Sequence, residues 1–268
     1  LTVTAHAGMH RYTFPSGKEA SIIIDLTHLL DNEYIYEAEL EQTAANEITG
    51  MRRTRGWTDN QYVYFVAQFS KPFQAIDFIQ NKKMVSAGVK LIGTDLQACL
   101  SFDNSNGEPV IAKVGLSIVS EKNARENLET EVIGFDFDAV RSAARSAWEQ
   151  ALSAITVKGG NTDDLKNFYT AMYHTLIHPN ILQDVSGQYP QMEGDKILTT
   201  NRNRYTVFSL WDTYRNVHQL MTLVYPERQM DMIHTMLGMY KEHGWFPKWE
   251  LYGRETLTME GDPSIRGI

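Results

Sequence analysis

Residues 209–215 read SLWDTYR and place an indole, a carboxylate and a guanidinium where a helix is expected to begin. One small polar residue is enough to accept the free N–H groups of a helix N-terminus, so Trp211, Asp212 and Arg215 need another explanation. One is an Asp212–Arg215 ion pair on a single helix face, which is worth only a fraction of a kcal/mol. The other is sugar binding, because a carboxylate and a guanidinium hydrogen-bond to neighbouring hydroxyls while an indole covers the C–H face of the ring. These residues alone leave both explanations open.

A second group of aromatic and acidic residues follows an expected helix, in GWFPKWEL at 244–251 and YGRETLTMEGDP at 252–263. Long, glycine-marked, aromatic loops at helix ends commonly form ligand sites. The alternative is a packed loop in which Trp245 and Trp249 fill the core. The carboxylates of this stretch could supply an acid and a base for glycoside hydrolysis, but spacing along the chain does not fix their separation in space.

The remaining candidates for chemistry are weaker. His174 and His178 have the i, i+4 spacing of a helical metal clamp, but there is no HExxH pattern and Pro179 is adjacent, so local hydrogen bonding is the better expectation. Residues 52–57 (RRTRGW) are expected to form a short basic turn, and Cys99 to be a small buried hydrophobe. The chain has no GxSxG, GxGxxG, Walker or CxxC pattern, so nothing indicates serine-nucleophile, nucleotide or zinc chemistry.

The composition limits the class of partner. The chain has 268 residues, is 43% hydrophobic and carries a formal charge of −8, from 25 Lys and Arg against 33 Asp and Glu. No basic run interleaves with aromatic residues, which argues against nucleic acid as a partner. No apolar stretch of about 18 residues occurs, so no membrane span is expected. Small neutral or cationic ligands fit this charge balance better.

The first half of the chain shows the alternation of β-strands, with turn chemistry such as DNSNG at 103–107. Many short strands without intervening helices indicate a β-sandwich, which we assign to residues 1–135. The expected strands cover 20–26, 34–40, 61–69, 90–102 and 110–120.

The period then becomes helical. Asp138 is the expected N-cap of a linker helix within 136–160, and Thr162 or Asp163 that of a second helix, which Pro179 ends. A third helix is expected near 212–224. Pro226 opens a fourth, which Gly244 ends. The residues expected to point inward are, in the second helix, Leu165, Phe168, Tyr169, Met172, Tyr173 and Leu176 and, in the fourth, Met230, Ile233, Leu237 and Tyr240.

Both ends of the sequence lack the features of a complete chain. It opens on the strand-like LTVTAHAGMHRYTF without an initiator Met or a leader, and it stops at MEGDPSIRGI without a closing element. About four helices would leave apolar faces uncovered, so further helices are expected downstream in a longer protein.

Taken in order, several motifs resemble glycoside hydrolase family 92, the calcium-dependent exo-acting α-mannosidases. They are HRYTF at 10–14, IIDL at 23–26, FSLWDTYR at 208–215, YPER at 225–228, GWFPKWEL at 244–251 and ETLTMEG at 255–261. The resemblance implies a β-sandwich at 1–135, a helical linker at 136–160 and the first hairpins of an (α/α)6 toroid catalytic domain at 161–268.

The resemblance also implies an inverting mechanism. A carboxylic acid protonates the leaving oxygen and a carboxylate base activates water, with the two carboxyl groups roughly 6.5–9.5 Å apart. Calcium binds the 2- and 3-hydroxyls of mannose, as suits a cation that prefers oxygen ligands. The acid, the base and the calcium ligands are expected downstream of Ile268, so none of these roles is given to Glu250, Glu255 or Asp262.

For this chain the resemblance implies part of a mannose-binding subsite. SLWDTYR is expected to be its first element, with Asp212 and Arg215 on distal hydroxyls and Trp211 as a wall. The expected neighbours are Trp249, Glu250, Glu255 and Thr256.

The implied substrate is a mannose-containing glycan, and family habit implies export to the periplasm or cell surface. Two rival hypotheses stay open. One is a non-catalytic carbohydrate-binding or scaffold protein with the same architecture. The other is a sandwich-plus-toroid disaccharide phosphorylase, which would need phosphate-binding groups and no calcium; no cluster of such groups is evident in the sequence.

Overall fold

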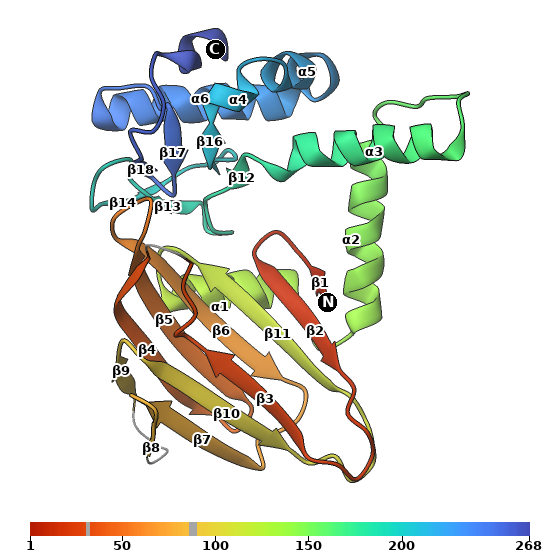
Figure 1. The fold of residues 1–268 in the computed structure, drawn as a ribbon, viewed down its shortest axis with the longest axis vertical. Coiled ribbons are helices and arrows are strands. Elements are labelled where there is room, and N and C mark those ends of the chain that lie inside the picture. Colours follow the sequence, from red (N-terminus) through yellow and green to blue (C-terminus); the bar gives the residue numbers. More distant parts are fainter. Residues whose placement is uncertain (31–32, 86–89) are drawn as a thin grey trace. The chain divides into compact units, whose positions relative to one another are not determined.

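The structure, a computed structural model, describes residues 1–30, 33–85 and 90–268. The chain forms two compact units, residues 1–144 and 145–268 (Figure 1). The first is rich in strands and the second in helices, as the change of period predicts. The three-part division with boundaries at 135 and 160 stays a prediction.

The first unit is built on two antiparallel sheets. Among the described residues, the larger sheet has the strand order β1 (Thr2–Val3), β2 (Ala7–Tyr12), β11 (Val110–Ser117), β6 (Gln61–Phe69), β5 (Glu47–Arg55), β4 (Tyr34–Ala44), β9 (Leu91–Gly93). The smaller sheet has the order β3 (Ala20–Asp25), β10 (Leu96–Phe102), β7 (Ala75–Gln80), β8 (Lys83–Val85). Both sheets contribute to one apolar core, with Leu40 and Ile48 from the larger sheet and Phe78 and Leu100 from the smaller. This is the sandwich arrangement that the alternation predicts.

Strand β10 shows how the alternation works. Leu96, Ala98 and Leu100 are fully buried, and the residues between them point to the opposite face. Cys99 lies on that opposite face and is only half-buried. The prediction that Cys99 is a buried hydrophobe is therefore wrong.

Two other strand predictions need correction. The single strand predicted over 90–102 is two strands, because the chain leaves the larger sheet after β9 and enters the smaller sheet at β10. The predicted basic turn at 52–57 is largely the end of β5. Arg53 pairs with Tyr62 on β6, and its guanidinium lies 5.4 Å from the centre of that ring, so cross-strand contact stabilises an arginine-rich strand.

Helix α1 (Glu121–Glu131) is missing from the sequence-based prediction, which continued a strand to residue 120. The Ser120 hydroxyl caps this helix by accepting the N–H of Asn123 at 3.1 Å. Ala124 and Leu128 are fully buried against the larger sheet. Only a narrow stripe of α1 is apolar, so its hydrophobic period is easily overlooked.

A partly buried ion pair joins α1 to the larger sheet. The Arg125 guanidinium donates to both carboxylate oxygens of Glu47 on β5, at 2.7 and 2.8 Å, and Gln68 donates to the same carboxylate at 2.8 Å. The hydrogen bond from Arg125 is the largest of the effects that lower the pKa of Glu47, from 4.5 to about 2. The Glu47 side chain is only 8% exposed, so this pair is weakly screened by solvent.

Replacing Glu47 with Gln should lower the free energy of unfolding by about 2 kcal/mol at pH 7, since the partly buried Arg125 guanidinium loses its counter-charge. A lowered folded-state pKa stabilises the protein above the unfolded-state value of 4.5, and this gain is lost as the pH falls towards 2. Denaturant unfolding at several pH values should therefore show the difference shrinking below about pH 4.5. Glu126→Gln, on the exposed face of α1, is the matched control. A constant difference at all pH values would contradict this account.

Helix α2 (Phe137–Leu152) confirms the first predicted helix, with a different N-cap. Asp136 accepts the N–H of Ala139 at 2.9 Å. Asp138, the predicted cap, instead forms an ion pair with Arg11 at 2.8 Å.

The N-cap of helix α3 (Thr162–Ile177) lies one residue earlier than predicted. Asn161, not Thr162 or Asp163, is the N-cap and forms a capping box with Asp164. Of its predicted inward residues Met172 and Leu176 are buried, whereas Tyr173 is 41% exposed.

The predicted third helix is two helices, α4 (Leu210–Thr213) and α5 (Val217–Val224). Helix α6 (Pro226–His243) confirms the fourth, with Pro at its first turn and Gly244 at φ +94° as its left-handed C-cap.

The predicted inward face of α6 is wrong in part. Met230 and Tyr240 are about half exposed, while Met232, Met236 and Met239 are fully buried. Methionine and other apolar residues occur on more than one side of this helix, so the period alone did not single out the buried face.

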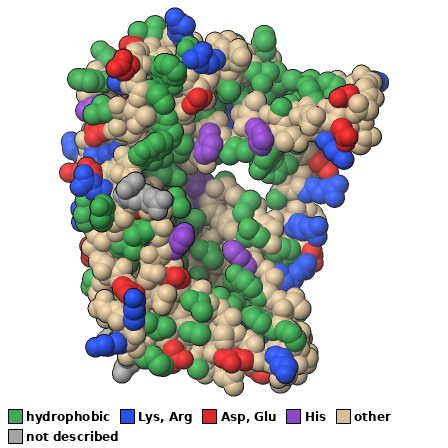
Figure 2. Space-filling model, in the orientation of Figure 1, with side chains coloured by type: hydrophobic (Ala, Val, Ile, Leu, Met, Phe, Trp, Pro, Cys, Tyr) green, Lys and Arg blue, Asp and Glu red, His purple; other side chains and the backbone are tan. Residues whose placement is uncertain are grey.

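Short strands complete the second unit. They form the pairs β12 (Asn180–Ile181) with β15 (Tyr205–Thr206) and β13 (Gln188–Pro190) with β14 (Ile197–Thr199), and the sheet β16 (Phe208–Ser209), β17 (Trp249–Leu251), β18 (Arg254–Glu255). A 3-10 helix, η1 (Pro263–Arg266), follows. Acidic and basic side chains are interspersed on the face drawn in Figure 2. No helix within the described residues is long and apolar enough to cross a membrane.

Candidate functional site

A small sheet brings the two sequence motifs together. Strand β16 opens SLWDTYR, and β17 and β18 carry the end of GWFPKWEL and the turn after it (Figure 1). Ser209 pairs with Trp249, and Phe208 with Glu250. Glu250 in turn pairs with Glu255. Helices α5 and α6 separate the two motifs in sequence, and this register makes them neighbours in space.

Glu250 is the most buried of the predicted site residues, at 0% exposure. Its Oε1 accepts the Thr206 hydroxyl at 2.9 Å and the Gly253 N–H at 2.6 Å, and its Oε2 accepts the Val207 N–H at 3.0 Å. Burial raises the pKa of Glu250 to about 7, against the lowering effects of these hydrogen bonds and of the Arg204 charge. Its predicted contact with a substrate stays a prediction.

The backbone beside this carboxylate adopts left-handed conformations. Val207 has φ +62°, which is a rare value for a β-branched residue and costs on the order of 1–3 kcal/mol. Tyr252 and Gly253 have φ +53° and +82° and form the two-residue turn between β17 and β18. Such strain persists only where surrounding contacts fix it.

Glu255 and Thr256 hold the loop around Trp249. The Glu255 carboxylate accepts the backbone N–H groups of Lys248 at 2.7 Å and of Trp249 and Leu257 at 3.1 Å. The Thr256 hydroxyl donates to the Trp249 carbonyl at 2.9 Å. Both side chains therefore engage the backbone on either side of β17, and their predicted substrate contacts stay predictions.

Trp211, Asp212 and Arg215 are exposed on and beside α4. The Trp211 indole N–H donates to the Glu260 carbonyl at 3.0 Å, which joins α4 to the loop after β18. The Arg215 guanidinium lies 5.3 Å from the Trp211 ring centre and 5.1 Å from that of Tyr214. Asp212 accepts the Ser209 hydroxyl, and the ion pair considered between these two described residues, Asp212 and Arg215, is not formed.

The arrangement therefore has two layers. Glu250, with Glu255 and Thr256, holds the backbone. Trp211, Asp212 and Arg215 present an aromatic edge, a carboxylate and a guanidinium to solvent. This exposed set, which we call the α4 wall, has the chemistry that hydrogen-bonds hydroxyls and covers an apolar ring face.

A buried ion pair that the sequence analysis did not single out supports the same region. Arg204 and Glu242 are 2.9 Å apart, with side chains 5% and 10% exposed. Glu242 also accepts the Tyr189 hydroxyl at 3.1 Å and the Met192 N–H at 2.9 Å. The partners lie on elements far apart in sequence, so no local pattern could have indicated them.

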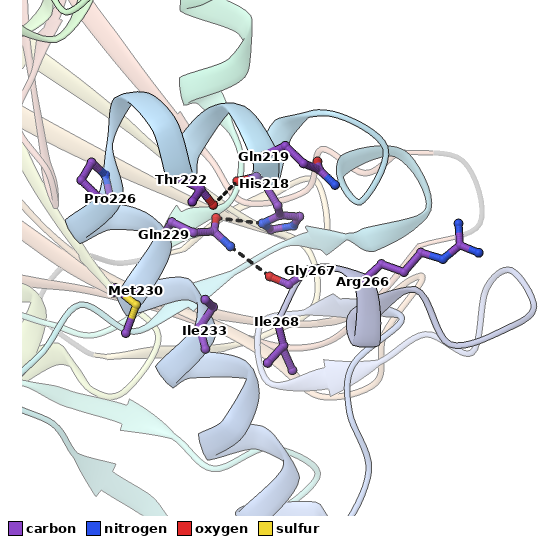
Figure 3. Close-up of a pocket in the computed structure, with 10 residues that line it drawn as sticks. All are labelled: His218, Gln219, Thr222, Pro226, Gln229, Met230, Ile233, Arg266, Gly267 and Ile268. Carbon is purple, nitrogen blue, oxygen red and sulfur yellow. Dashed lines mark hydrogen bonds between the residues drawn. The ribbon is translucent and has the colours of Figure 1, made fainter.

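A cavity of about 260 Å³ lies between α5, α6 and η1 (Figure 3). His218 at its edge bonds Gln229 through Nδ1 at 3.0 Å and Thr213 through Nε2 at 3.1 Å, and burial lowers its pKa. Gln229 donates to the Gly267 carbonyl at 3.0 Å. Both ring nitrogens of His218 are thus engaged within the protein.

The described residues do not fit calcium on their own. No group of three or more His, Cys, Asp or Glu side chains among them could hold a metal ion. Asp212 accepts the Ser209 hydroxyl, and Glu255 accepts backbone N–H groups, so no calcium ligand is assigned to these residues.

The sequence matches two domain models of one family. The glycosyl hydrolase family 92 N-terminal domain matches residues 1–117, and the family 92 catalytic domain matches residues 123–268. The chain belongs to glycosyl hydrolase family 92. The resemblance drawn from SLWDTYR and GWFPKWEL is thereby confirmed.

Similar proteins agree with this assignment. An uncharacterized secreted glycosidase of Arthroderma benhamiae is 27% identical over 283 residues, which cover 97% of this chain and 32% of that protein. A family GH92 α-mannosidase from Bacteroides thetaiotaomicron superposes with a TM-score of 0.92 at 34% identity, over 98% of this chain and 36% of that one. That mannosidase is also solved in complex with mannoimidazole.

A second solved protein, the inverting GH92 mannosidase from Bacteroides thetaiotaomicron VPI-5482, has a TM-score of 0.86 at 24% identity over 97% of this chain and 35% of that one. At this identity the likeness shows the fold alone. The chain spans about a third of the length of these relatives.

Proposed function

We propose that these residues form part of an exo-acting α-mannosidase that removes terminal α-linked mannose from glycans, and that the α4 wall is one side of its mannose site. The observation that carries the proposal is the exposed set Trp211, Asp212 and Arg215, held by a buried carboxylate layer in a chain of family 92. The α-mannosidase neighbour bound to mannoimidazole supports the choice of sugar.

Each side chain of the wall has a distinct task in this proposal. Asp212 accepts hydrogen bonds from neighbouring mannose hydroxyls. Arg215, steadied over the Trp211 and Tyr214 rings, donates to a hydroxyl on the same sugar. Trp211, fixed by its bond to the Glu260 carbonyl, covers an apolar face of the pyranose. Such contacts select a sugar by its hydroxyl pattern and orient it for reaction.

The chemical step is proposed to invert configuration, with acid and base outside these 268 residues. Glu250 and Glu255 are unsuited to either role, because Glu250 is fully buried and Glu255 accepts three backbone N–H groups. Calcium and the (α/α)6 toroid belong to the same proposal. The calcium ligands are proposed to lie outside this chain, since the described residues contain no group that fits the ion.

Export to the periplasm or cell surface completes the proposal, supported by the description of the Arthroderma relative as secreted. The rival is a non-catalytic carbohydrate-binding protein of the same architecture. Binding of mannosides without turnover by the full-length gene product would favour that rival.

Asp212→Ala in the full-length gene product should lower kcat/KM on α-mannosides by about 100-fold or more, because hydroxyl contacts that tighten in the transition state supply several kcal/mol. Initial rates over a range of α-mannobiose concentrations measure the effect. Glu227→Gln, an exposed residue of α6, is the control and should leave the rate unchanged. A near-normal rate for Asp212→Ala would remove Asp212 from the site.

Release of mannose from an α-1,2-linked mannobiose should be seen with the full-length product, should fall on addition of a calcium chelator and should return when calcium is restored. The 268-residue chain, assayed beside it, should release none. Activity in the short chain would place the acid and the base among the carboxylates described above. Chelator-resistant activity in the long form would refute the calcium part of the proposal.

A further inference from the structure

We propose that Glu250 is a positioning residue, which holds the α4 wall in its working geometry through Thr206, Val207 and Gly253 and does not itself touch the sugar. This inference rests on the proposed function and adds to it a residue that acts from beneath the site.

The hydrogen bonds around Glu250 form a closed network. The Thr206 hydroxyl donates to Glu250 and accepts the Tyr252 N–H at 2.8 Å. The N–H groups of Val207 and Gly253 donate to the same carboxylate. One side chain thus joins the strand that enters SLWDTYR to the turn that follows GWFPKWEL.

The strained backbone of Val207 makes the position of the α4 wall depend on this network. Val207 precedes β16 directly, and its left-handed φ of +62° sets the direction in which the chain enters Phe208 and Ser209. Its N–H has the Glu250 carboxylate as its partner. Loss of that partner would leave the unfavourable conformation with less to fix it, and the chain direction into α4 would relax.

The ladder between β16 and β17 is too short to hold the register alone. It consists of the pairs Phe208–Glu250 and Ser209–Trp249, extended by a bond from the Leu210 N–H to the Lys248 carbonyl at 3.1 Å. A one-residue slip would reverse the faces of Ser209 and its neighbours. The hydrogen bonds that Glu250 accepts from Thr206 and Val207 hold the chain just before the first residue pair of this ladder.

A carboxylate is needed because three donors point at it. The amide of Glu250→Gln would turn an NH₂ group toward either the Val207 N–H or the Thr206 and Gly253 donors, and one side would lose its acceptor. The side chain keeps its size, so packing is little changed. The substitution therefore tests the hydrogen bonds separately from the volume of the residue.

The test is a double-mutant cycle in the full-length product. Glu250→Gln should lower kcat/KM on α-mannobiose at least tenfold in the wild-type background and by a clearly smaller factor in the Asp212→Ala background, because one of the sugar contacts that Glu250 positions is already absent. Equal losses in both backgrounds, or no loss in the wild-type background, would overturn the proposal. Glu227→Gln, exposed on α6, is the control and should leave both rates unchanged.

Amide hydrogen exchange gives a readout that does not depend on activity. Glu250→Gln should speed exchange in peptides covering 206–215, while peptides of β6 and β11 should stay unchanged. Unchanged exchange at 206–215 would overturn the proposal. If the wild-type protein releases no mannose, the proposed function fails, while faster exchange would still support the hold of Glu250 on this segment. If Glu250→Gln does not fold, Thr206→Val removes one donor of the same network and allows both measurements.

Discussion

A carboxylate that is fully removed from water must find hydrogen-bond donors inside the protein, or its burial costs several kcal/mol. Glu250 meets this condition with the Thr206 hydroxyl and two backbone N–H groups, which joins the segment before β16 to the turn after β17. The donors come from segments on both sides of α5 and α6. Satisfying one buried charge therefore fixes how two distant motifs meet.

The positions of the exposed side chains of the α4 wall depend on these buried hydrogen bonds. Asp212 and Arg215 lie on and just after the single turn of α4, which is too short to be stable through helical hydrogen bonds alone. Its geometry comes from β16 before it, from the bond between Trp211 and the Glu260 carbonyl, and from the buried Leu210. Under the proposed function, the sugar-binding surface is therefore held by groups that do not touch the ligand. In the first unit, too, a buried carboxylate joins two elements, since Glu47 pairs with the partly exposed Arg125 and connects α1 to the larger sheet.

The sequence predicts the elements better than their junctions. Alternation and helical period located β3, β4, β6, β10 and β11 and the helices α2, α3 and α6, because burial of one face requires those periods. Strands β5 and β7 were not among the predicted strands. Helix α1 escaped notice because its apolar stripe is narrow. The break between β9 and β10 within residues 90–102 was also missed, because the apolar alternation continues on both sides of the point where the chain changes sheets. The motifs also placed Trp211 and Trp249 in one region, but the buried state of Glu250 depends on Thr206 and Val207, which no local pattern connects to it.

The most direct measurement of the central claim is a crystal structure of the full-length gene product with mannoimidazole. The account predicts that the sugar lies against Trp211 with hydroxyls within about 3.2 Å of Asp212 and Arg215, and that Glu250 stays bonded to Thr206, Val207 and Gly253 without touching the ligand. A sugar bound away from the α4 wall, or one that contacts Glu250 directly, would contradict it.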